Sequence, residues 1–299
     1  MLSRVTLGAD VAITSVILDG LKRRFPRAGI VFVGTRKAWE LFEADPRLRW
    51  LPVDYGRGAT LAERLAVWPE LRRELSQPDS LVVDPDSRLT QLGLLPVCAE
   101  SAYCFFESRS YGGDGDEPLP RLARRWVREI FGVGDARAYI APRAAPQAPS
   151  ITVSLGVGEN PAKRVADPFE EELLRGLAGL GGTLLVDRGA GGEERERVDR
   201  AISRSGGRIE TWDGAFAPFA ARIAGSRLYA GYDSAGQHVA AACGVPLVSV
   251  FGGFVSERMF ARWRPDGPGP IHVQRVKDRP PQAVLRDTLA AVARLWKPL

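Results

Sequence analysis

The sequence is poor in the residues that build disulfide frameworks and metal centres. Its 299 residues include three cysteines, Cys98, Cys104 and Cys243, and two histidines, His238 and His272. An odd number of cysteines without C-x-x-C spacing argues against a disulfide framework and against a zinc site. Two histidines are also too few for a histidine-rich metal centre. The sequence therefore predicts no metal site, and the cysteine content fits a reducing compartment.

Long apolar runs are missing as well. Stretches such as residues 30–33 and 239–243 are far shorter than the roughly 20 residues that a membrane-spanning helix needs. The first charge of the chain is not followed by the long apolar segment of a secretory signal. We therefore expect no membrane span, no signal peptide and a cytoplasmic location.

Charge of one sign does not dominate the composition. The 41 lysines and arginines against 36 aspartates and glutamates leave a net charge of +5. This excess is too small to indicate nucleic-acid binding, but it suits an anionic ligand. Hydrophobic residues at 45% and charged residues at 26% are typical of a globular protein and exclude a disordered, collagen-like or coiled-coil chain.

Short apolar segments alternate with segments of helical period along the chain. This pattern is typical of repeated βα units and predicts an α/β fold with parallel sheets. Strands are expected at residues 3–7, 30–33, 49–53, 80–84, 151–155, 183–186, 227–230, 247–251 and 271–273. Helices are expected at residues 13–25, 38–43, 61–75, 89–95, 193–203, 234–243 and 281–295, whereas residues 104–120 are expected to form a loop rich in Gly and Asp.

Residues 143–149 are the best candidate for a linker, because Pro146 and Pro149 disfavour a helix there. At about 150 residues per domain, the length of the chain also predicts two domains. We expect Rossmann-like domains at residues 1–145 and 150–299, with the last helix either in the second domain or packed back on the first. A ligand is expected in the cleft between them.

Asp10 belongs to the first motif, Gly8-Ala9-Asp10, which leads from an expected strand into an expected helix. Two interpretations of this residue stay open. Asp10 is either the N-cap of the helix, where it satisfies free backbone N–H groups, or a carboxylate that accepts a proton from a ligand and is kept ionised by the helix dipole.

The second motif is the stretch DSAGQH at residues 233–238, which follows an expected strand and opens an expected helix. Gly236 lets the backbone approach a ligand, and the N–H groups of the first helical turn can hold a phosphate. Asp233 can accept hydrogen bonds from sugar hydroxyls. The alternative is an ordinary helix cap, with His238 packed in the core.

Two further motifs combine glycines with charges. Residues 156–164 end in Lys163 and Arg164, which suit a diphosphate, although the spacing is neither that of a P-loop nor that of a dinucleotide-binding turn. In the stretch at residues 187–195, Glu193 or Glu194 can accept a hydrogen bond from a ribose hydroxyl. The alternatives are a solvated basic loop and acidic residues that stabilise a helix dipole.

Taken in order, these segments resemble the heptosyltransferase-like glycosyltransferases of family nine. In the first half the similarity is carried by Asp10, Thr14, the helix end KRRFP at residues 22–26 and the strand at residues 30–33. In the second half it is carried by Lys163-Arg164, the turn before Glu193-Glu194, residues 233–242, Gly244-Val245-Pro246 and Phe251-Gly252. The resemblance spans most of the chain and implies the GT-B fold, in which two Rossmann-like domains face each other across a cleft.

The resemblance implies that the second half binds a nucleotide-diphosphate sugar, for which ADP-heptose is the best-known case in the family. Lys163 would neutralise the diphosphate, the amides of residues 234–236 would cradle it, and Asp233 would orient the sugar. The donor residues implied in this way are Lys163, Arg164, Glu193, Glu194, Asp233, Ser234, Ala235, Gly236 and His238.

By the same resemblance, Asp10 would act as general base on an acceptor hydroxyl, with inversion at the anomeric carbon and without a metal or cofactor. Candidate residues on the acceptor side are Thr14, Asp86, Arg88 and Arg109. The acceptor would be a glycan, a lipid-linked molecule or a natural product, and not a nucleic acid. Peripheral contact with a membrane surface stays open.

The sequence departs from the family at several positions. Val165-Ala166 stand where the family often has Trp-Pro, Gly252-Gly253-Phe254 where it often has Gly-Pro-Thr, and Ala9 separates Gly8 from Asp10. Two other functions therefore stay open. One is a nucleotide-sugar epimerase or hydrolase on the same fold, and the other is a protein that binds a nucleotide sugar without catalysis.

Overall fold

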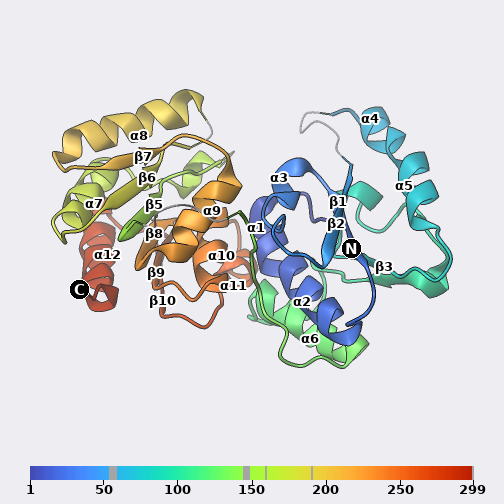
Figure 1. Cartoon of the computed structure of the whole chain (residues 1–299). Helices are drawn as coiled ribbons and strands as arrows, with labels where there is room; N and C mark the ends of the chain where they lie inside the picture. Colours follow the sequence, from blue (N-terminus) through green and yellow to red (C-terminus); the bar gives the residue numbers. More distant parts are fainter. Residues whose placement is uncertain (54–58, 144–148, 159, 190, 298–299) are drawn as a thin grey trace. The chain divides into compact units, whose positions relative to one another are not determined.

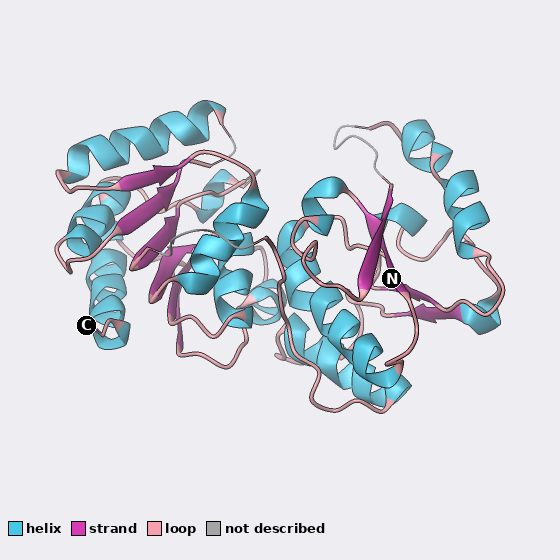
Figure 2. Cartoon of the chain, viewed as in Figure 1, coloured by secondary structure: helices cyan, strands magenta, loops and turns pink. Residues whose placement is uncertain are grey.

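The computed structural model describes residues 1–53, 59–143, 149–158, 160–189 and 191–297. It divides into two compact units, Met1–Pro142 and Arg143–Leu299. Helices and parallel strands alternate in both units, as Figures 1 and 2 show. The predicted α/β class is confirmed.

The first unit contains two pairs of parallel strands. One pair is β1 (Ile30–Gly34) with β2 (Leu48–Pro52), and the other is β3 (Val82–Asp84) with β4 (Tyr103–Phe105). The start of the chain links them, because Leu2 donates its N–H to Val83 and Ser3 donates its N–H to Val33, at 3.0 and 2.8 Å.

The strand predicted at residues 3–7 is wrong in its position. Only Leu2 forms a strand-like bridge, with Val33, and Val5 adopts a positive φ of 67° that ends the extended backbone. In space, the neighbouring extended segments of this unit follow the order β2, β1, residues 1–3, β3 and β4. This order reverses direction beside residues 1–3, which is where doubly wound sheets bind ligands.

A helical run follows this segment. It consists of α1 (Leu7–Ala9), the π-helical turn η1 (Asp10–Thr14) and α2 (Ser15–Arg24). Helix α2 packs closely on α6 (Leu119–Phe131). A side chain at Gly20 would place its Cβ 2.4 Å from a methyl group of Val127, so this crossing requires glycine.

Several predictions for the first unit are wrong in detail. The helix expected at residues 61–75 is two helices, α4 (Leu61–Ala66) and α5 (Trp68–Leu75), because Pro69, which lacks an N–H, starts a new helix. The helix expected at residues 89–95 is one 3₁₀ turn, η2 (Arg88–Thr90), because the next residues have positive φ. The other elements are α3 (Arg36–Trp39) and η3 (Glu100–Ala102).

The second unit is built on one parallel sheet with the spatial order β10-β9-β8-β5-β6-β7. The strands are β5 (Ile151–Ser154), β6 (Leu184–Asp187), β7 (Glu210–Trp212), β8 (Leu228–Tyr232), β9 (Leu247–Phe251) and β10 (Ile271–Arg275). Every residue of β5, β8 and β9 is buried, as expected for strands that helices cover on both faces.

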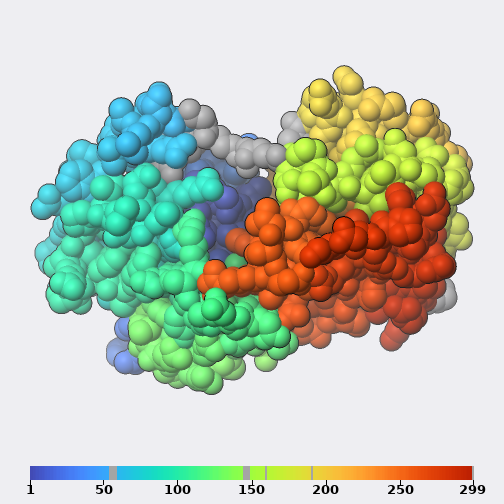
Figure 3. Space-filling view, turned by 180° about the vertical axis from the view of Figure 1, so that it is seen from behind, coloured from blue at the N-terminus to red at the C-terminus, as the bar shows by residue number. Residues whose placement is uncertain are grey.

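The helices of the second unit lie on the two faces of this sheet (Figures 1 and 2). Their bounds are α7 (Phe169–Ala178), α8 (Gly192–Ser205), α9 (Phe216–Gly225), α10 (Ala235–Ala242), α11 (Glu257–Trp263) and α12 (Pro281–Leu295), with a 3₁₀ turn η4 (Pro161–Lys163). Helix α7 packs against α8 and α12, and α9 packs against α10. Helix α12, red in Figure 3, forms part of the outer surface of this unit.

The strand order of the second unit reverses between β5 and β8. In open parallel sheets, ligands bind outside the carboxyl ends of the strands at such a reversal. The loops that follow β5 and β8 are therefore where a ligand of this unit is expected, and they contain two of the four sequence motifs.

Candidate functional site

Lys163 and Asp233 meet at the carboxyl end of the second unit's sheet. The ammonium of Lys163 lies 3.0 Å from Asp233 Oδ2 and donates to the backbone carbonyl of Asp233 at 2.8 Å. Burial raises the pKa of the Asp233 carboxyl, while the Lys163 charge opposes this shift. The structure thus brings together the two residues on which the predicted donor site most depends.

The orientation of Asp233 is set by a buried relay. Ser249 donates to the carbonyl oxygen of the Gln237 side chain, and the amide nitrogen of Gln237 donates to Asp233 Oδ1. Gln237 and Ser249 are fully buried. Because the Ser249 hydroxyl donates to the Gln237 oxygen, the Gln237 nitrogen faces the Asp233 carboxylate.

Helix α10 begins beside this pair, with Ser234 as its N-cap residue. Ala235 and Gly236 form its first turn. A Cβ at Gly236 would lie 2.3 Å from the Tyr229 hydroxyl, so only glycine fits there. The Ser234 side chain forms no cap hydrogen bond, so the alternative of an ordinary side-chain cap does not hold at this residue.

His238 lies one turn into α10 and is almost completely buried. Its Nδ1 has no hydrogen-bond partner among the described residues, and its ring packs edge-on against Trp263. Burial, reinforced by the charge of Lys163, lowers the pKa of His238 to about 4. The imidazole is therefore neutral at physiological pH, with one buried nitrogen whose hydrogen bond is unmade.

The loop after β5, here called the β5 loop (residues 155–158 and 160–165), carries Lys163. Asn160 donates its side-chain amide to the Gly253 carbonyl at 3.0 Å and accepts from the Ala162 N–H. At Gly253, with φ of 64°, an added Cβ would lie 2.7 Å from the backbone of Ala162. The close approach of this glycine therefore helps to place the turn that holds Lys163.

Glu194 binds the β5 loop directly, because its carboxylate accepts the N–H groups of Val157 and Gly158 at 2.8 and 3.3 Å. Glu194, one of the two residues predicted to contact a ribose, thus holds backbone amides of this loop. Glu193 is exposed in the first turn of α8. Arg164 does not join Lys163 either, but pairs with Asp167 and with the buried Glu170.

Asp10 is fully buried in the first unit. Its carboxylate accepts hydrogen bonds from the Ser3 hydroxyl, the Arg4 N–H and the Thr14 hydroxyl, at 2.8, 2.7 and 2.8 Å. Burial raises the pKa of Asp10 to about 6, because it outweighs these three hydrogen bonds.

The N-cap interpretation of Asp10 is wrong, since the residue lies inside the helical run and begins η1. Its carboxylate reaches back to the end of the first extended segment. Removal from water raises the pKa of this carboxyl but leaves it below neutral pH, so Asp10 is still ionised at pH 7. Thr14 is buried and serves Asp10 as a donor.

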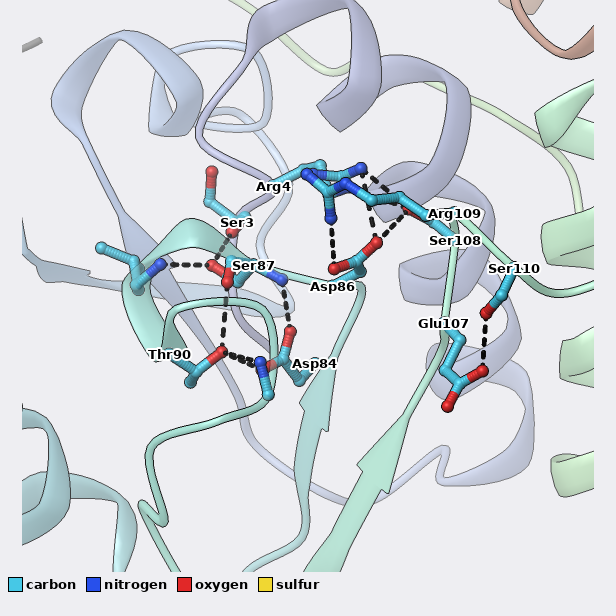
Figure 4. Close-up of polar contacts among 12 residues, drawn as sticks. Ser3, Arg4, Asp84, Asp86, Ser87, Thr90, Glu107, Ser108, Arg109 and Ser110 are labelled. Atoms are coloured by element: carbon cyan, nitrogen blue, oxygen red, sulfur yellow. Dashed lines mark hydrogen bonds and ion pairs between the residues drawn. The ribbon is translucent and has the colours of Figure 1, made fainter. Parts of the chain in front are cut away.

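Figure 4 shows a cluster of charges around Arg4, the residue whose N–H donates to Asp10. Arg4 is 6% exposed and donates through Nε and Nη2 to the Ser108 hydroxyl. Ser108 donates to Asp86 at 2.9 Å, and Asp86 also lies 3.7 Å from Arg4. Arg109 pairs with the other oxygen of Asp86 while almost half of its side chain is exposed.

The predicted acceptor residues Asp86 and Arg109 thus contact each other, and Arg88 is exposed on the 3₁₀ turn that follows Ser87. Burial lowers the pKa of Arg4 to about 10, with Arg109 adding to the shift and the carboxylates opposing it. Arg4 connects this cluster to the candidate base, because its N–H donates to Asp10 and its guanidinium lies 3.7 Å from Asp86.

Four functional candidates escaped the sequence analysis: Arg4, Glu170, Gln237 and Ser249. Gln237 lies inside a motif that was recognised, so its spacing from Asp233 in one helical turn could have indicated their contact. The others offered no local pattern, because their partners are distant in the sequence. Arg4 and Ser108 are 104 positions apart in the sequence, and Gln237 and Ser249 are 12 positions apart, so the fold brings each pair together.

Within the described residues, no group of three or more His, Cys, Asp or Glu side chains is placed to hold a metal ion. No helix among them is long and apolar enough to cross a membrane.

No protein-family model matches the sequence, and no curated protein matches it. Several solved structures, by contrast, match the fold of the chain. The glycosyl transferase family 9 structure from Veillonella parvula DSM 2008 is 17% identical with a TM-score of 0.69, and 98% of this chain covers 96% of that one. The E. coli heptosyltransferase WaaC with ADP-2-deoxy-2-fluoro heptose is 17% identical with a TM-score of 0.70, with coverage of 98% and 97%.

The chain has the GT-B fold. The resemblance to family 9 glycosyltransferases is confirmed at the level of this fold. A putative UDP-N-acetylglucosamine 2-epimerase from Listeria monocytogenes also matches, with 14% identity, a TM-score of 0.52 and coverage of 98% and 87%. The GT-B fold thus occurs with more than one chemistry, and the activity has to be argued from the residues.

Proposed function

We propose that the protein is a glycosyltransferase that moves a sugar, heptose or a related one, from a nucleotide diphosphate to an acceptor hydroxyl. One observation carries the proposal. At the carboxyl ends of β5 and β8, Lys163 and Asp233 meet at the start of α10, in a chain with the fold of family 9 glycosyltransferases. A base for the same reaction is present as Asp10.

The donor residues have distinct tasks. Lys163 and the amides of residues 234–236 bind the diphosphate, because an ammonium and a helix N-terminus both favour anions. His238 offers its unpartnered Nδ1 to the donor. Asp233, which Gln237 holds in place, accepts hydrogen bonds from the sugar. Glu193 is the acidic residue left for the ribose. ADP-heptose is the first donor to test, since ligands of this class are named with WaaC.

The chemical step begins when the Asp10 carboxylate takes the proton of the acceptor hydroxyl. The oxygen of the acceptor then forms a bond to the anomeric carbon while the bond from that carbon to the diphosphate oxygen breaks, which inverts the configuration. The diphosphate leaves with the bonding electron pair. Lys163 and the α10 amides stabilise its negative charge, so the reaction needs no metal or cofactor.

The acceptor side is formed by the Arg4–Asp86–Arg109 cluster and by Arg88. The exposed guanidinium groups of Arg88 and Arg109 favour an acceptor that carries an anionic group. A glycan, a lipid-linked molecule or a natural product meets this requirement.

The test is turnover with a panel of ADP-, UDP- and GDP-sugars in the presence and absence of acidic acceptors. Release of nucleotide diphosphate that depends on the acceptor is expected, and Asp10→Ala is expected to abolish it. Release without any acceptor would indicate a hydrolase, and conversion of the sugar without release would indicate an epimerase, as the Listeria neighbour is named. Binding without turnover would leave a nucleotide-sugar-binding protein.

A further inference from the structure

The β5 loop obtains much of its position from side chains of other elements. Leu155 accepts from Arg197 Nη2 at 2.8 Å, Val157 donates to Glu194, and Val165 donates to the Tyr232 hydroxyl at 3.1 Å. Apart from the short turn η4, the loop has no helix or strand of its own among its described residues. Its shape therefore depends on how firmly these anchors are held.

Glu170, in the first turn of α7, holds two of these anchors. Its side chain is 2% exposed, and its Oε1 accepts from the Tyr232 hydroxyl at 2.9 Å and from Arg197 Nη1. Arg164 Nε lies 3.5 Å from the same oxygen. Contacts from a strand, a helix and the β5 loop thus converge on one carboxylate oxygen.

The partners of Glu170 are neighbours of the donor residues. Tyr232 directly precedes Asp233, and Val165 follows Lys163 by two positions. Val165 contacts Tyr232, and Tyr232 and Arg197 both contact Glu170. These contacts join the loop that carries Lys163 to strand β8, which ends directly before Asp233.

A stabilising role alone does not account for this arrangement. Removing charges from water is costly, and replacing a buried ion pair by apolar residues of similar volume is often neutral or stabilising. What a hydrogen-bonded carboxylate adds is direction, because each donor must approach it in one geometry. Of the groups so directed, Tyr232 is adjacent to Asp233 in the sequence and Arg164 is adjacent to Lys163.

We infer that Glu170, Tyr232 and Arg197 are positioning residues that fix the β5 loop for binding of the nucleotide diphosphate. This inference rests on the proposed function. None of the three touches the donor, and they act through the backbone of Leu155 and Val165.

The main test is Tyr232→Phe, which removes one hydroxyl and keeps the ring. The affinity for ADP and UDP is measured by calorimetry, and hydrogen exchange is measured at the Val165 amide. We expect nucleotide affinity to fall about 5- to 20-fold, as for loss of one or two hydrogen bonds, and Val165 to exchange at least about 10-fold faster. The thermal midpoint, by contrast, is expected to move by only a few degrees.

Tyr139→Phe is the matched control, because it deletes the hydroxyl of another tyrosine that donates to a carboxylate, Asp45, in the first unit. It should change neither nucleotide affinity nor exchange at Val165. Arg197→Lys, which keeps the charge but cannot span Glu170 and Leu155 at once, should weaken ADP binding without loss of fold.

The outcomes separate the two proposals. Wild-type affinity together with wild-type exchange at Val165 in Tyr232→Phe would overturn the positioning role. Faster exchange with unchanged affinity would also overturn it, since the loop would then be anchored without serving the ligand. If the wild-type protein binds neither ADP nor UDP nor their sugars, the proposed function fails, and with it the positioning role that rests upon it, whatever the exchange shows.

Discussion

The Asp10 carboxylate accepts hydrogen bonds from three donors, and the residue has no surface exposed to water. A general base must be deprotonated to act, and burial raises the pKa of this carboxyl to about 6. We therefore expect kcat/KM to be level above about pH 7 and to fall about tenfold per pH unit below pH 6. This fall is measured by a pH profile of kcat/KM for the acceptor at saturating donor, and it forms the acidic limb of the profile. Activity that stays constant down to pH 4.5 would contradict the expectation.

Thr14→Val tests the same carboxyl without removing it. Loss of the Thr14 hydroxyl removes a donor that favours the charged form, so the pKa of Asp10 rises further. The acidic limb should move to higher pH while the activity at pH 8 changes little. Thr14→Ser keeps the hydroxyl and should leave the limb in place, so equal profiles for the two variants would argue against Asp10 as the base.

Lys163 carries the charge that the proposed diphosphate needs. Lys163→Met keeps most of the apolar stem but removes the ammonium, and we expect ADP to bind about 10- to 100-fold more weakly, as for loss of a charge-assisted hydrogen bond. The exposed Arg200, which pairs only loosely with Glu196 at 3.9 Å, provides the control Arg200→Met. A loss of the same size in both variants would indicate a general charge effect.

At the scale of elements, Gly253 tests how the β5 loop is placed. Gly253→Ala puts a Cβ 2.7 Å from the backbone of Ala162, whereas Gly206→Ala, at a similar positive φ of 71°, meets open space. Both substitutions cost about 1 kcal/mol of backbone strain, but only the first displaces the turn of Lys163. Calorimetry should show weaker ADP binding for Gly253→Ala alone, and equal binding would remove Gly253 from the site.

Elements with a strong periodic pattern were predicted well, and elements set by special backbone angles were not. Helix α12 has the bounds expected from its apolar spacing, and β9 lies where its apolar run predicted. The chain between residues 3 and 14 was predicted poorly, because the positive φ of Val5 and the π turn at Asp10 depend on contacts with β1 and β3. A local pattern contains no information about such partners.

Where a motif contains its own partner, the spacing within the motif is enough to indicate the contact. Asp233 and Gln237 lie one helical turn apart, and Asp10 and Thr14 do as well. The motifs gave no indication of the contacts that Glu194 and Arg164 make within the chain, with the backbone of the β5 loop and with Glu170. The charge of a residue does not show whether its side chain binds a ligand or contacts other residues of the same chain.

At the scale of the whole molecule, the proposed roles divide between the two units. Addition of ADP should therefore slow hydrogen exchange in residues 155–158, 160–165 and 233–242, by restricting the amides around the diphosphate. Residues 3–14 and 84–109 should exchange as before. Mass spectrometry of peptides measures this, and protection confined to the first unit would place the nucleotide in the wrong half of the chain.

The chain passes from one unit to the other once, between Pro142 and Arg143. Residues that would choose the acceptor precede this point, and residues that would choose the donor follow it. Acceptor specificity and donor specificity would then be encoded by two separate and continuous segments of the gene. A single recombination event at this junction could give an enzyme a new acceptor while it keeps its sugar nucleotide, which makes the junction a natural place both for diversification and for the construction of chimeras.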